Sequence, residues 1–399
     1  MSSPKIASVN SAWNLMMRTS APSPCCPRVL HAALAVALAG CGKHEPPPPA
    51  LGAPSDDAVE ARERTESPSA TPPHNAPAAP PIRDDGTVYA EATMMGTHWS
   101  INAFITPDKT ATQAGVAIRA AMAEVSRIEM IASEWQADSE LSRLNRRAGA
   151  GPLPISIELF EILELSKEVS EASHGAFDVS FYGVGSLWKF KPGSAPPTDE
   201  DILEKLGLVD YTKIKLDKNA GTASLLLRGM AIGLGGVAKG YAVDRAVAVM
   251  RAHGFRDVIV EGGGDVYLAG SKGETAWHVG IQDPQRNGAV GKLDVRDQAV
   301  VTSGNYQRFF EHEGTKYAHI LDPRTGHPVP YERSPRSVSV IAQDTARADA
   351  YATALAVMGV PRGIEFAANT PELEAMMIDA AGTVHVTPGL KKRFEFLGP

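Results

Sequence analysis

The sequence predicts an α+β fold in which mixed or antiparallel sheets pack against helices. Helical patterns and short β-like runs both occur from about residue 87 onward. Many of these runs follow one another as hairpin-like pairs, whereas a parallel sheet would require strict alternation of strands and helices. In addition, 43% hydrophobic and 21% charged residues in a chain of 399 suit a soluble globular protein with a sizeable core.

Helical spacing of apolar residues predicts four helices, near 110–132, 155–174, 236–253 and 346–358. Gly175 follows the second helix and Gly359 follows the fourth, and glycine is common just past a helix end. Runs rich in β-branched and aromatic residues predict strands within 98–105, 222–229, 256–263, 265–270, 276–284, 298–306, 317–323, 336–342 and 374–386. No repeat of fixed period links these elements.

The first 40 residues are predicted to be an export signal. Residues 1–28 carry three basic residues and no acid, and the apolar run that follows is too short to span a membrane stably. The run ends in Leu-Ala-Gly-Cys at 38–41, which resembles a bacterial lipobox with Cys41 as the lipidated first residue of the mature chain. Cleavage by an ordinary signal peptidase after small residues is the alternative.

Residues 41–86 are predicted to form a flexible tether between Cys41 and the folded domain. Residues 42–86 contain eleven prolines among alanines and small polar residues, a composition that cannot bury a core. Cys25 and Cys26 belong to the signal, so the mature chain has no pair of cysteines for an internal disulfide. The expected organisation is a lipid anchor, a tether and a globular domain over 87–399, held at a membrane of the bacterial envelope and facing the periplasm or exterior.

The charge of the chain argues against nucleic acid as a partner. The formal net charge is -7, whereas proteins that bind nucleic acids need clustered Lys and Arg to contact phosphates.

Several catalytic and nucleotide-binding motifs fail at one or more positions. The run at 233–241 is not a P-loop, because Ala238 precedes Lys239 and glycine follows it. The histidine at 312 lacks the second histidine of a zinc-protease helix, and Ser303 lacks the frame of a hydrolase elbow. The pattern Gly233-x-Gly235-x-x-Ala238 leaves open a dinucleotide-binding fold, with Glu261 as its acid.

Lys239 and the helix at 346–358 carry the remaining chemical signals. A lysine in the first turn of a helix opposes the helix dipole, and its neighbours in sequence are small and apolar, so we expect a bound anion to offset its charge. Asp349 and Thr353 lie four residues apart and therefore share one helix face. They are either ordinary capping and surface residues or part of a Mg²⁺ site.

Blocks along 87–390 together resemble the ApbE family of FAD:protein FMN transferases. They are Met-Gly-Thr at 95–97, SEWQADSELSRLN, GAFDVS, LGGVAKGYAVD, TSGNYQRFFEHEGTKYAHILDPRTGHPV and ADAYATA. The family consists of exported, often lipid-anchored enzymes. The resemblance implies that this chain binds FAD with Mg²⁺ and moves the FMN part onto a threonine or serine of an exported or membrane acceptor protein, releasing AMP.

The resemblance also implies roles for individual residues. Lys239 would meet the pyrophosphate, and the Gly236 carbonyl with the Asp349 and Thr353 side chains would hold Mg²⁺. The flavin and adenosine pockets would be lined by Met95, Trp135, Ala176, Phe177 and Asp178. Without the resemblance, Trp135 reads equally as a core residue and Asp178 as a cap.

His319 and Asp322 would lie beside the reacting phosphate and the acceptor hydroxyl. His319 is the expected general base, because histidine titrates near neutral pH, and Asp322 would orient it or share its role. Many relatives carry aspartate where this chain has Gly233, which changes the expected contact with FAD. A Mg²⁺-dependent FAD pyrophosphatase and a non-catalytic FAD-binding lipoprotein are the alternative functions.

Overall fold

The computed structural model describes residues 7–8, 80–286, 288–304 and 309–397. Cys41, nearly all of the predicted signal and nearly all of the predicted tether lie outside the described residues. Within the described residues, no helix is both long enough and apolar enough to cross a membrane.

The last residues of the predicted tether, 80–86, already contact the folded domain. Ile82 forms a β-bridge with Val88, and the Arg83 amide donates to the Thr87 carbonyl at 2.8 Å. Asp85 pairs with Lys272 at 3.0 Å. Contacts with the domain therefore begin a few residues before the expected boundary at 87.

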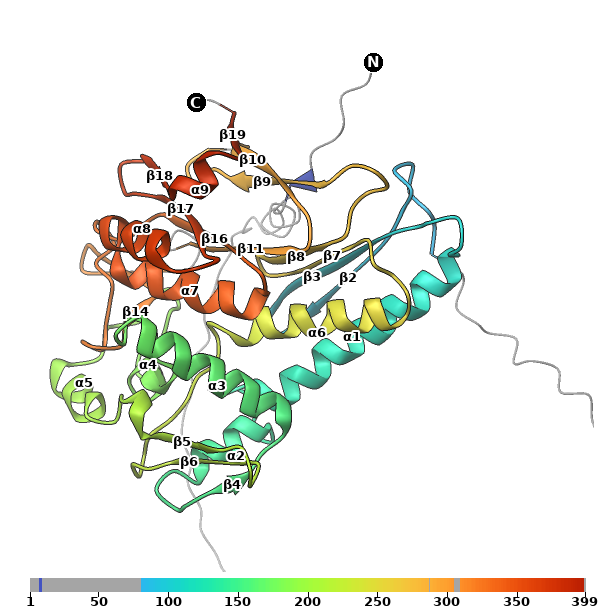
Figure 1. Cartoon of the computed structure of the whole chain (residues 1–399). Helices are drawn as coiled ribbons and strands as arrows, with labels where there is room; N and C mark the ends of the chain where they lie inside the picture. Colours follow the sequence, from blue (N-terminus) through green and yellow to red (C-terminus); the bar gives the residue numbers. More distant parts are fainter. Residues whose placement is uncertain (1–6, 9–79, 287, 305–308, 398–399) are drawn as a thin grey trace, which may run out of the picture. The chain divides into compact units, whose positions relative to one another are not determined.

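An eight-stranded, fully antiparallel sheet forms the centre of the domain (Figure 1). Its order is β18-β17-β16-β11-β8-β7-β3-β2. The strands are β2 (Thr87–Met94), β3 (Thr97–Phe104), β7 (Val258–Gly262), β8 (Asp265–Ala269), β11 (Gln298–Gly304), β16 (Ser337–Ala342), β17 (Glu374–Ile378) and β18 (Val384–Val386).

Helices cover one face of this sheet (Figure 1). The largest apolar cluster joins sheet residues such as Trp99, Val260 and Val340 to small and aliphatic residues of α1, α6 and α7. The helices on this side are α1 (Ala111–Ala132), α3 (Ile157–Ala172), α6 (Ala238–Ala252), α7 (Thr345–Met358) and α8 (Val360–Asn369). Burying this face removes a large apolar area from water and is the main stabilisation of the fold.

A second sheet covers the opposite face. Its order is β1-β9-β10-β19, and a separate apolar cluster that includes Leu268, Trp277 and Phe394 lies between the two sheets. The strands are β1 (Ala7–Ser8), β9 (Trp277–Gln282), β10 (Ala289–Val295) and β19 (Phe394–Phe396), and the short helix α9 (Pro388–Lys391) precedes β19.

Smaller elements lie beyond the helical layer. A three-stranded sheet is formed by β4 (Leu153–Pro154), β5 (Ile214–Asp217) and β6 (Thr222–Leu225), and α2 (Glu140–Arg146) contacts β6. A third apolar cluster around Trp188 and Phe310 joins α4 (Tyr182–Gly185) and α5 (Asp199–Leu206) to the hairpin β12–β13 and to the pair β14–β15. These strands are β12 (Phe309–His312), β13 (Thr315–Ala318), β14 (Leu321–Asp322) and β15 (His327–Pro328).

The structure confirms the α+β class and the four predicted helices, which appear as α1, α3, α6 and α7. Patterns for α2, α5 and α8 were missed because these helices are short, at 7, 8 and 10 residues. The expected strand over 317–323 is instead the end of β13 and the two residues of β14, with His319 between them. The dinucleotide-binding alternative is wrong, because that fold needs a parallel sheet and the central sheet is antiparallel.

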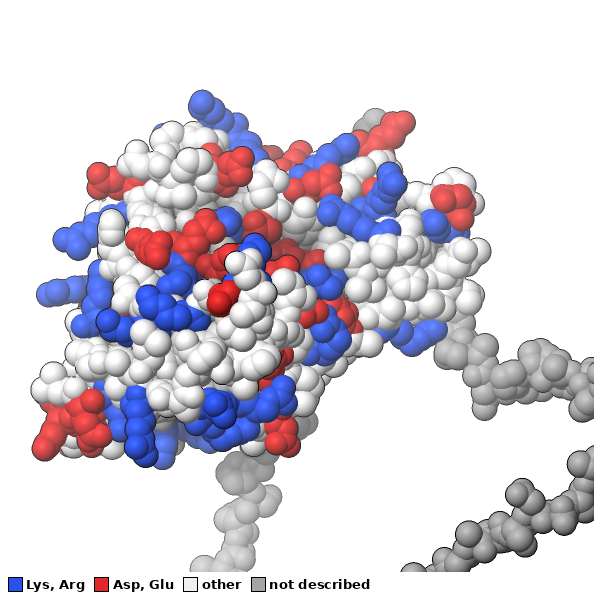
Figure 2. Space-filling view, turned by 60° about the horizontal axis from the view of Figure 1, so that its bottom comes forward, with Lys and Arg blue, Asp and Glu red and all other residues white. Residues whose placement is uncertain are grey.

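Charged side chains of both signs are interspersed on the face shown in Figure 2. Lys and Arg form no single continuous field on this face of the described part of the chain.

The helices α6 and α7 cross very closely at Gly240. A Cβ atom on Gly240 would lie 2.3 Å from the Thr345 carbonyl oxygen and 2.8 Å from the Ala346 Cα, which is closer than carbon atoms approach in proteins. Only glycine fits this crossing, and the crossing places Lys239 of α6 beside the first turns of α7.

We expect Gly240→Ala to destabilise the fold by about 1–3 kcal/mol. The added methyl group would clash with backbone atoms, which cannot move aside by changing a side-chain rotamer. Gly207→Ala is the matched control, since nothing lies within 4 Å of its Cβ position and its φ of -62° suits alanine. Urea unfolding of both variants tests this expectation. Equal midpoints for the two alanine variants would contradict a tight crossing.

Candidate functional site

The loop before α6 places Lys239 at the start of that helix. The Leu234 carbonyl accepts hydrogen bonds from the Val237 amide at 3.0 Å and the Ala238 amide at 2.8 Å, which turns the chain sharply into the helix. The N-cap residue Val237 has no capping side chain. Lys239 is therefore presented from a tight, glycine-rich turn in which the backbone can approach a ligand.

Helix α7 contributes Asp349 and Thr353. Asp344 caps the helix by accepting the Arg347 amide at 2.8 Å, and Asp349 follows in the next turn with only 2% of its surface exposed. The alternative in which Asp349 is a surface residue is therefore wrong. A Cβ atom at Gly236 would lie 2.9 Å from Thr353 Oγ1, so this face of α7 lies directly against the loop before α6.

Lys239 lies between two buried carboxylates. Its Nζ is 2.9 Å from Asp265 Oδ2 and 3.0 Å from Asp349 Oδ2. The same Asp349 oxygen accepts the Gly240 amide at 3.3 Å. The neighbours of Lys239 in sequence are small and apolar, but the fold also brings two acids to its side chain that are 26 and 110 residues away in sequence.

Burial and mutual charge shift the protonation of this cluster. Burial lowers the pKa of Lys239, but the charges of Asp265 and Asp349 outweigh it, so the pKa of the ammonium lies above its usual range. Burial, followed by the nearby Asp349 charge, raises the pKa of Asp265 well above its usual value despite the opposing effect of Lys239. Lys239 is thus held as a cation between the two acids.

Sequence reasoning missed two acids at this site, Asp265 and Glu134. Asp265 begins β8, whose five residues are all buried, so an acid in an otherwise apolar strand was the available signal. Glu134 follows α1, and its Oε1 lies 3.7 Å from the position of a Cβ on Gly235. Burial raises the pKa of Glu134, while the Leu234 amide and the Lys239 charge lower it to a smaller extent.

Gly233 is explained by its neighbour Tyr182. A Cβ atom at position 233 would lie 2.8 Å from Tyr182 Cδ2, so no larger residue fits beside this ring. The Gly233 amide donates to the Val179 carbonyl at 2.9 Å, which fixes the loop against the segment before α4. In this chain, Tyr182 fills the space into which an aspartate at 233 would project.

Trp135 and Met95 lie near the end of α1. The Trp135 side chain is 80% exposed and meets Tyr182 edge to face, with 5.9 Å between the ring centroids. The alternative in which Trp135 is a core residue is therefore wrong. Met95 turns between β2 and β3 with a φ of 49°, and its amide donates to Glu129 Oε2 at 3.1 Å. An exposed tryptophan beside a tyrosine offers a flat surface on which an aromatic ligand can stack.

The segment 176–178 runs between α3 and the loop before α6. Ala176 and Phe177 are buried, and the Phe177 ring lies 3.3 Å from the Cβ position of Gly236. Asp178 caps the 3₁₀ turn Val179–Phe181 by accepting the Ser180 amide at 2.8 Å, and it accepts the Tyr211 amide at 3.0 Å. Asp178 therefore makes the cap that its sequence position allowed, which positions Phe177 against the loop.

His319 and Asp322 belong to the connection from β13 through β14. Both Asp322 oxygens are bound by the Arg324 guanidinium at 2.8 Å, and the Asp322 carbonyl accepts the Gly326 amide at 2.8 Å. Arg324 Cγ is 3.9 Å from the Cβ position of Gly175, which places this turn beside the segment that holds Phe177. Asp322 thus stabilises its own turn, and His319, three residues earlier, is partly exposed.

The residues at the start of α6 and on α7 fit a Mg²⁺ ion. Asp349 supplies a carboxylate and Thr353 a hydroxyl, and Gly236, whose backbone carbonyl is a further oxygen donor, lies against Thr353. Magnesium prefers such oxygen ligands and keeps water or substrate phosphate at its other positions. Asp265 Oδ2 is buried and accepts no well-aligned hydrogen bond from the described residues. The carboxylates at this point therefore outnumber the groups available to compensate them.

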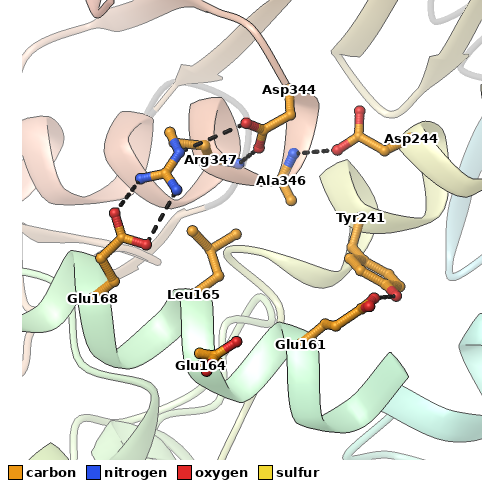
Figure 3. A pocket seen from close by; sticks show the side chains of 9 residues that line it. All are labelled: Glu161, Glu164, Leu165, Glu168, Tyr241, Asp244, Asp344, Ala346 and Arg347. Carbon is orange, nitrogen blue, oxygen red and sulfur yellow. Dashed lines mark hydrogen bonds and ion pairs between the residues drawn. The ribbon is translucent and has the colours of Figure 1, made fainter. Parts of the chain in front are cut away.

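A separate acidic cavity of about 290 Å³ opens between α3, α6 and α7. Figure 3 shows that α3 contributes glutamates and that Asp244 of α6 faces the start of α7. Asp244 accepts the Thr345 and Ala346 amides, both at 2.9 Å, and Arg347 pairs with Glu168 at 2.6 Å. The lining residues are Glu161, Glu164, Leu165, Glu168, Tyr241, Asp244, Asp344, Ala346 and Arg347.

Comparison with known proteins identifies related sequences and structures. Residues 95–377 match the model of the ApbE family. The FAD:protein FMN transferase of Treponema pallidum (strain Nichols) is 34% identical over 301 residues, which is 70% of this chain and 83% of the relative. That of Klebsiella pneumoniae (strain 342) is 29% identical over 273 residues, 68% of this chain and 84% of the relative.

Two solved structures share the fold. The ApbE protein of Thermotoga maritima aligns with a TM-score of 0.70 at 27% identity, covering 77% of this chain and 99% of its own. The flavin transferase ApbE of Vibrio cholerae aligns with a TM-score of 0.68 at 26% identity and the same coverage. Both alignments extend over the domain that carries the Lys239 cluster.

We expect Asp244→Asn to change how stability depends on pH. Burial raises the pKa of Asp244 to about 7, so the native state holds a proton that the unfolded chain releases near pH 4. The contribution of Asp244 to stability is therefore complete at low pH and is lost as pH rises toward 7, by about 4 kcal/mol. Unfolding free energies measured from pH 4 to 8 should fall less steeply in Asp244→Asn.

The control for this measurement is Asp344→Asn, which changes a more exposed acid lining the same cavity and retains a good capping residue. This variant should keep the slope of the parent. Parallel curves for the parent and Asp244→Asn would show that Asp244 does not titrate in this range.

Proposed function

Because the chain belongs to the ApbE family, we propose that it is an FAD:protein FMN transferase that uses Mg²⁺, modifies a threonine or serine of its acceptor and releases AMP. The observation that carries the proposal is the convergence of Gly236 and Lys239, at the start of α6, with Asp349 and Thr353 of α7. A cation and hard oxygen ligands at one point suit a diphosphate bound with a divalent metal ion.

The charge balance of the site supports a requirement for Mg²⁺. Among the described residues, Asp265 and Asp349 pair with Lys239, and Glu134 lies close enough to feel its charge. A diphosphate brought here would add further negative charge in a largely buried environment, where repulsion is weakly screened. When bound, Mg²⁺ would neutralise charge on the diphosphate and on the departing AMP.

The residues of the chain then position FAD and move one proton. Lys239 binds the pyrophosphate, Asp349, Thr353 and Gly236 hold Mg²⁺, and Trp135 with Tyr182 offers a stacking surface for the flavin. The acceptor hydroxyl oxygen bonds to the phosphorus next to riboflavin, the bond from that phosphorus to the bridging oxygen breaks, and AMP leaves with this oxygen. His319 takes the hydroxyl proton, since Asp322 is bound by Arg324.

We also propose that the mature chain is a lipoprotein of the bacterial cell envelope. The lipobox ending in Cys41 supplies the anchor, and the proline-rich segment 42–86 supplies reach from the membrane. The domain would then meet an exported or membrane acceptor protein on the periplasmic or outer side.

Transfer itself is measured by incubating the protein with FAD, Mg²⁺ and a candidate acceptor, and following the products by mass spectrometry. An FMN adduct on a threonine or serine with one AMP per adduct supports the proposal. Free FMN and AMP without an adduct indicate an FAD pyrophosphatase. Quenching of flavin fluorescence without products indicates a protein that only binds FAD.

Asp349→Asn and His319→Ala should each slow adduct formation by roughly 10²–10⁴-fold, because one loses a charged metal ligand and the other the proton acceptor. The two variants should differ in metal dependence: excess Mg²⁺ partly restores Asp349→Asn and leaves His319→Ala unchanged. Asp85→Asn, an exposed acid paired with Lys272, is the control for general effects of removing a carboxylate. Parent rates in Asp349→Asn and His319→Ala at saturating Mg²⁺ would refute the assigned roles.

Cys41→Ala should release the mature protein from the membrane fraction, because the thiol that carries the lipid is lost. Fractionation of expressing bacteria and labelling with a fatty acid analogue measure this. Unchanged membrane association with no label on the parent protein would point to ordinary signal peptidase cleavage and another mode of attachment.

A further inference from the structure

The carboxylate of Asp265 lies in the site without a role in the mechanism above. It is 2% exposed, and its Oδ2 is 2.9 Å from Lys239 Nζ. Among the described residues that oxygen accepts no well-aligned hydrogen bond, so the ion pair with Lys239 is its main compensation for burial. The buried Asp265 carboxylate therefore depends on Lys239 to compensate its charge. Lys239 is also the residue that we propose contacts the substrate.

Lys239 and a metal ion compete for Asp349. Asp349 Oδ2 already faces Lys239 Nζ at 3.0 Å and the Gly240 amide at 3.3 Å. A divalent cation bound to Asp349 would lie near the ammonium and repel it in a buried environment. Binding of Mg²⁺ therefore weakens the hold of Asp349 on Lys239, and without another partner the ammonium would move away from the site.

Two contacts remain for Lys239 when its pairing with Asp349 weakens. One is Asp265 Oδ2 at 2.9 Å, and the other is the Gly235 carbonyl oxygen at 3.4 Å. Asp265 comes from β8, whereas Asp349 and Thr353, the proposed metal ligands with charged or hydroxyl side chains, come from α7. Its charge also offsets that of the ammonium when the charge of Asp349 is shared with the metal.

We propose that Asp265 is a positioning residue that keeps Lys239 beside the site while Mg²⁺ takes Asp349, so that the ammonium faces the pyrophosphate of FAD. This inference rests on the proposed function, since it assumes a bound metal ion and a diphosphate. In the metal-free protein, the Lys239 ammonium is shared by Asp265 and Asp349. In the protein that holds Mg²⁺ and FAD, Asp265 holds it.

The test is a double-mutant cycle on Mg²⁺ affinity, which requires no turnover. Mg²⁺ is titrated by calorimetry into the full mature chain, without nucleotide and with ADP as a diphosphate that carries no flavin. The variants are Asp265→Asn, Lys239→Gln and the double variant. Asp85→Asn, whose exposed carboxylate pairs with Lys272 at 3.0 Å, serves as the matched control and should leave the affinity unchanged.

Asp265→Asn should weaken Mg²⁺ binding about tenfold, because Lys239 then pairs with Asp349 alone and competes more strongly with the metal ion. Lys239→Gln should tighten Mg²⁺ binding, because the competitor is gone. The double variant should behave like Lys239→Gln alone, since Asp265 acts through the lysine. With ADP and saturating Mg²⁺, Asp265→Asn should weaken ADP binding less than Lys239→Gln does.

An equal loss of Mg²⁺ affinity from Asp265→Asn in the parent and in the Lys239→Gln background would overturn the proposal, because Asp265 would then act on the metal ion directly. Unchanged Mg²⁺ affinity with reduced thermal stability would overturn it in favour of a purely structural role. A parent chain that binds no Mg²⁺ in either condition would also overturn it.

Lys239→Gln leaves two buried acids together and its folding is checked by thermal unfolding. If it does not fold, the double variant is compared with Asp265→Asn, and the test rests on whether the double variant binds Mg²⁺ more tightly. Equal or weaker binding contradicts the proposal. Because no acceptor is present, a chain that transfers no FMN can still show this coupling, and an active transferase can fail to show it.

Discussion

The close crossing of α6 and α7 at Gly240 is the constraint on which the candidate site depends. With no side chain at this position, the two helices approach until the backbone of one nearly touches that of the other. Lys239, the preceding residue, therefore reaches Asp349 from the neighbouring helix, and the loop before α6 lies against Thr353. A wider crossing would separate the cation from the acid and the loop from the hydroxyl.

The antiparallel sheet sets the other half of the arrangement. Strand β8 lies at the centre of the sheet between β7 and β11, and its first residue, Asp265, points its carboxylate at Lys239. A partly buried cation between two buried acids is tolerable because each charge has an opposite neighbour within 3.0 Å. The same arrangement leaves more carboxylates than positive charges at this point, which suits the Mg²⁺ ion that we propose binds here with a diphosphate.

The side of the site proposed to bind the flavin is built differently. Tyr182 crowds position 233 and meets the exposed ring of Trp135, so two aromatic rings and a glycine lie together here. Glu134 lies on the same side, close to Gly235. The resemblance to the family implied that Asp178 and Asp322 contact the cofactor or the reacting groups. In the structure Asp178 accepts a hydrogen bond from a backbone amide and Asp322 accepts hydrogen bonds from the Arg324 guanidinium, and both stabilise turns.

The sequence by itself determined the α+β class, the four long helices and the family, because apolar periodicity and several ordered motifs are local properties of the chain. It also placed Asp349 and Thr353 on one face, since four residues make about one helical turn. Only the tertiary structure decided what surrounds Lys239, because Asp265 and Asp349 come from distant segments that meet through sheet order and helix crossing. Burial, which turns an ordinary acid into a site residue, is a property of the packed fold and cannot be read from local spacing.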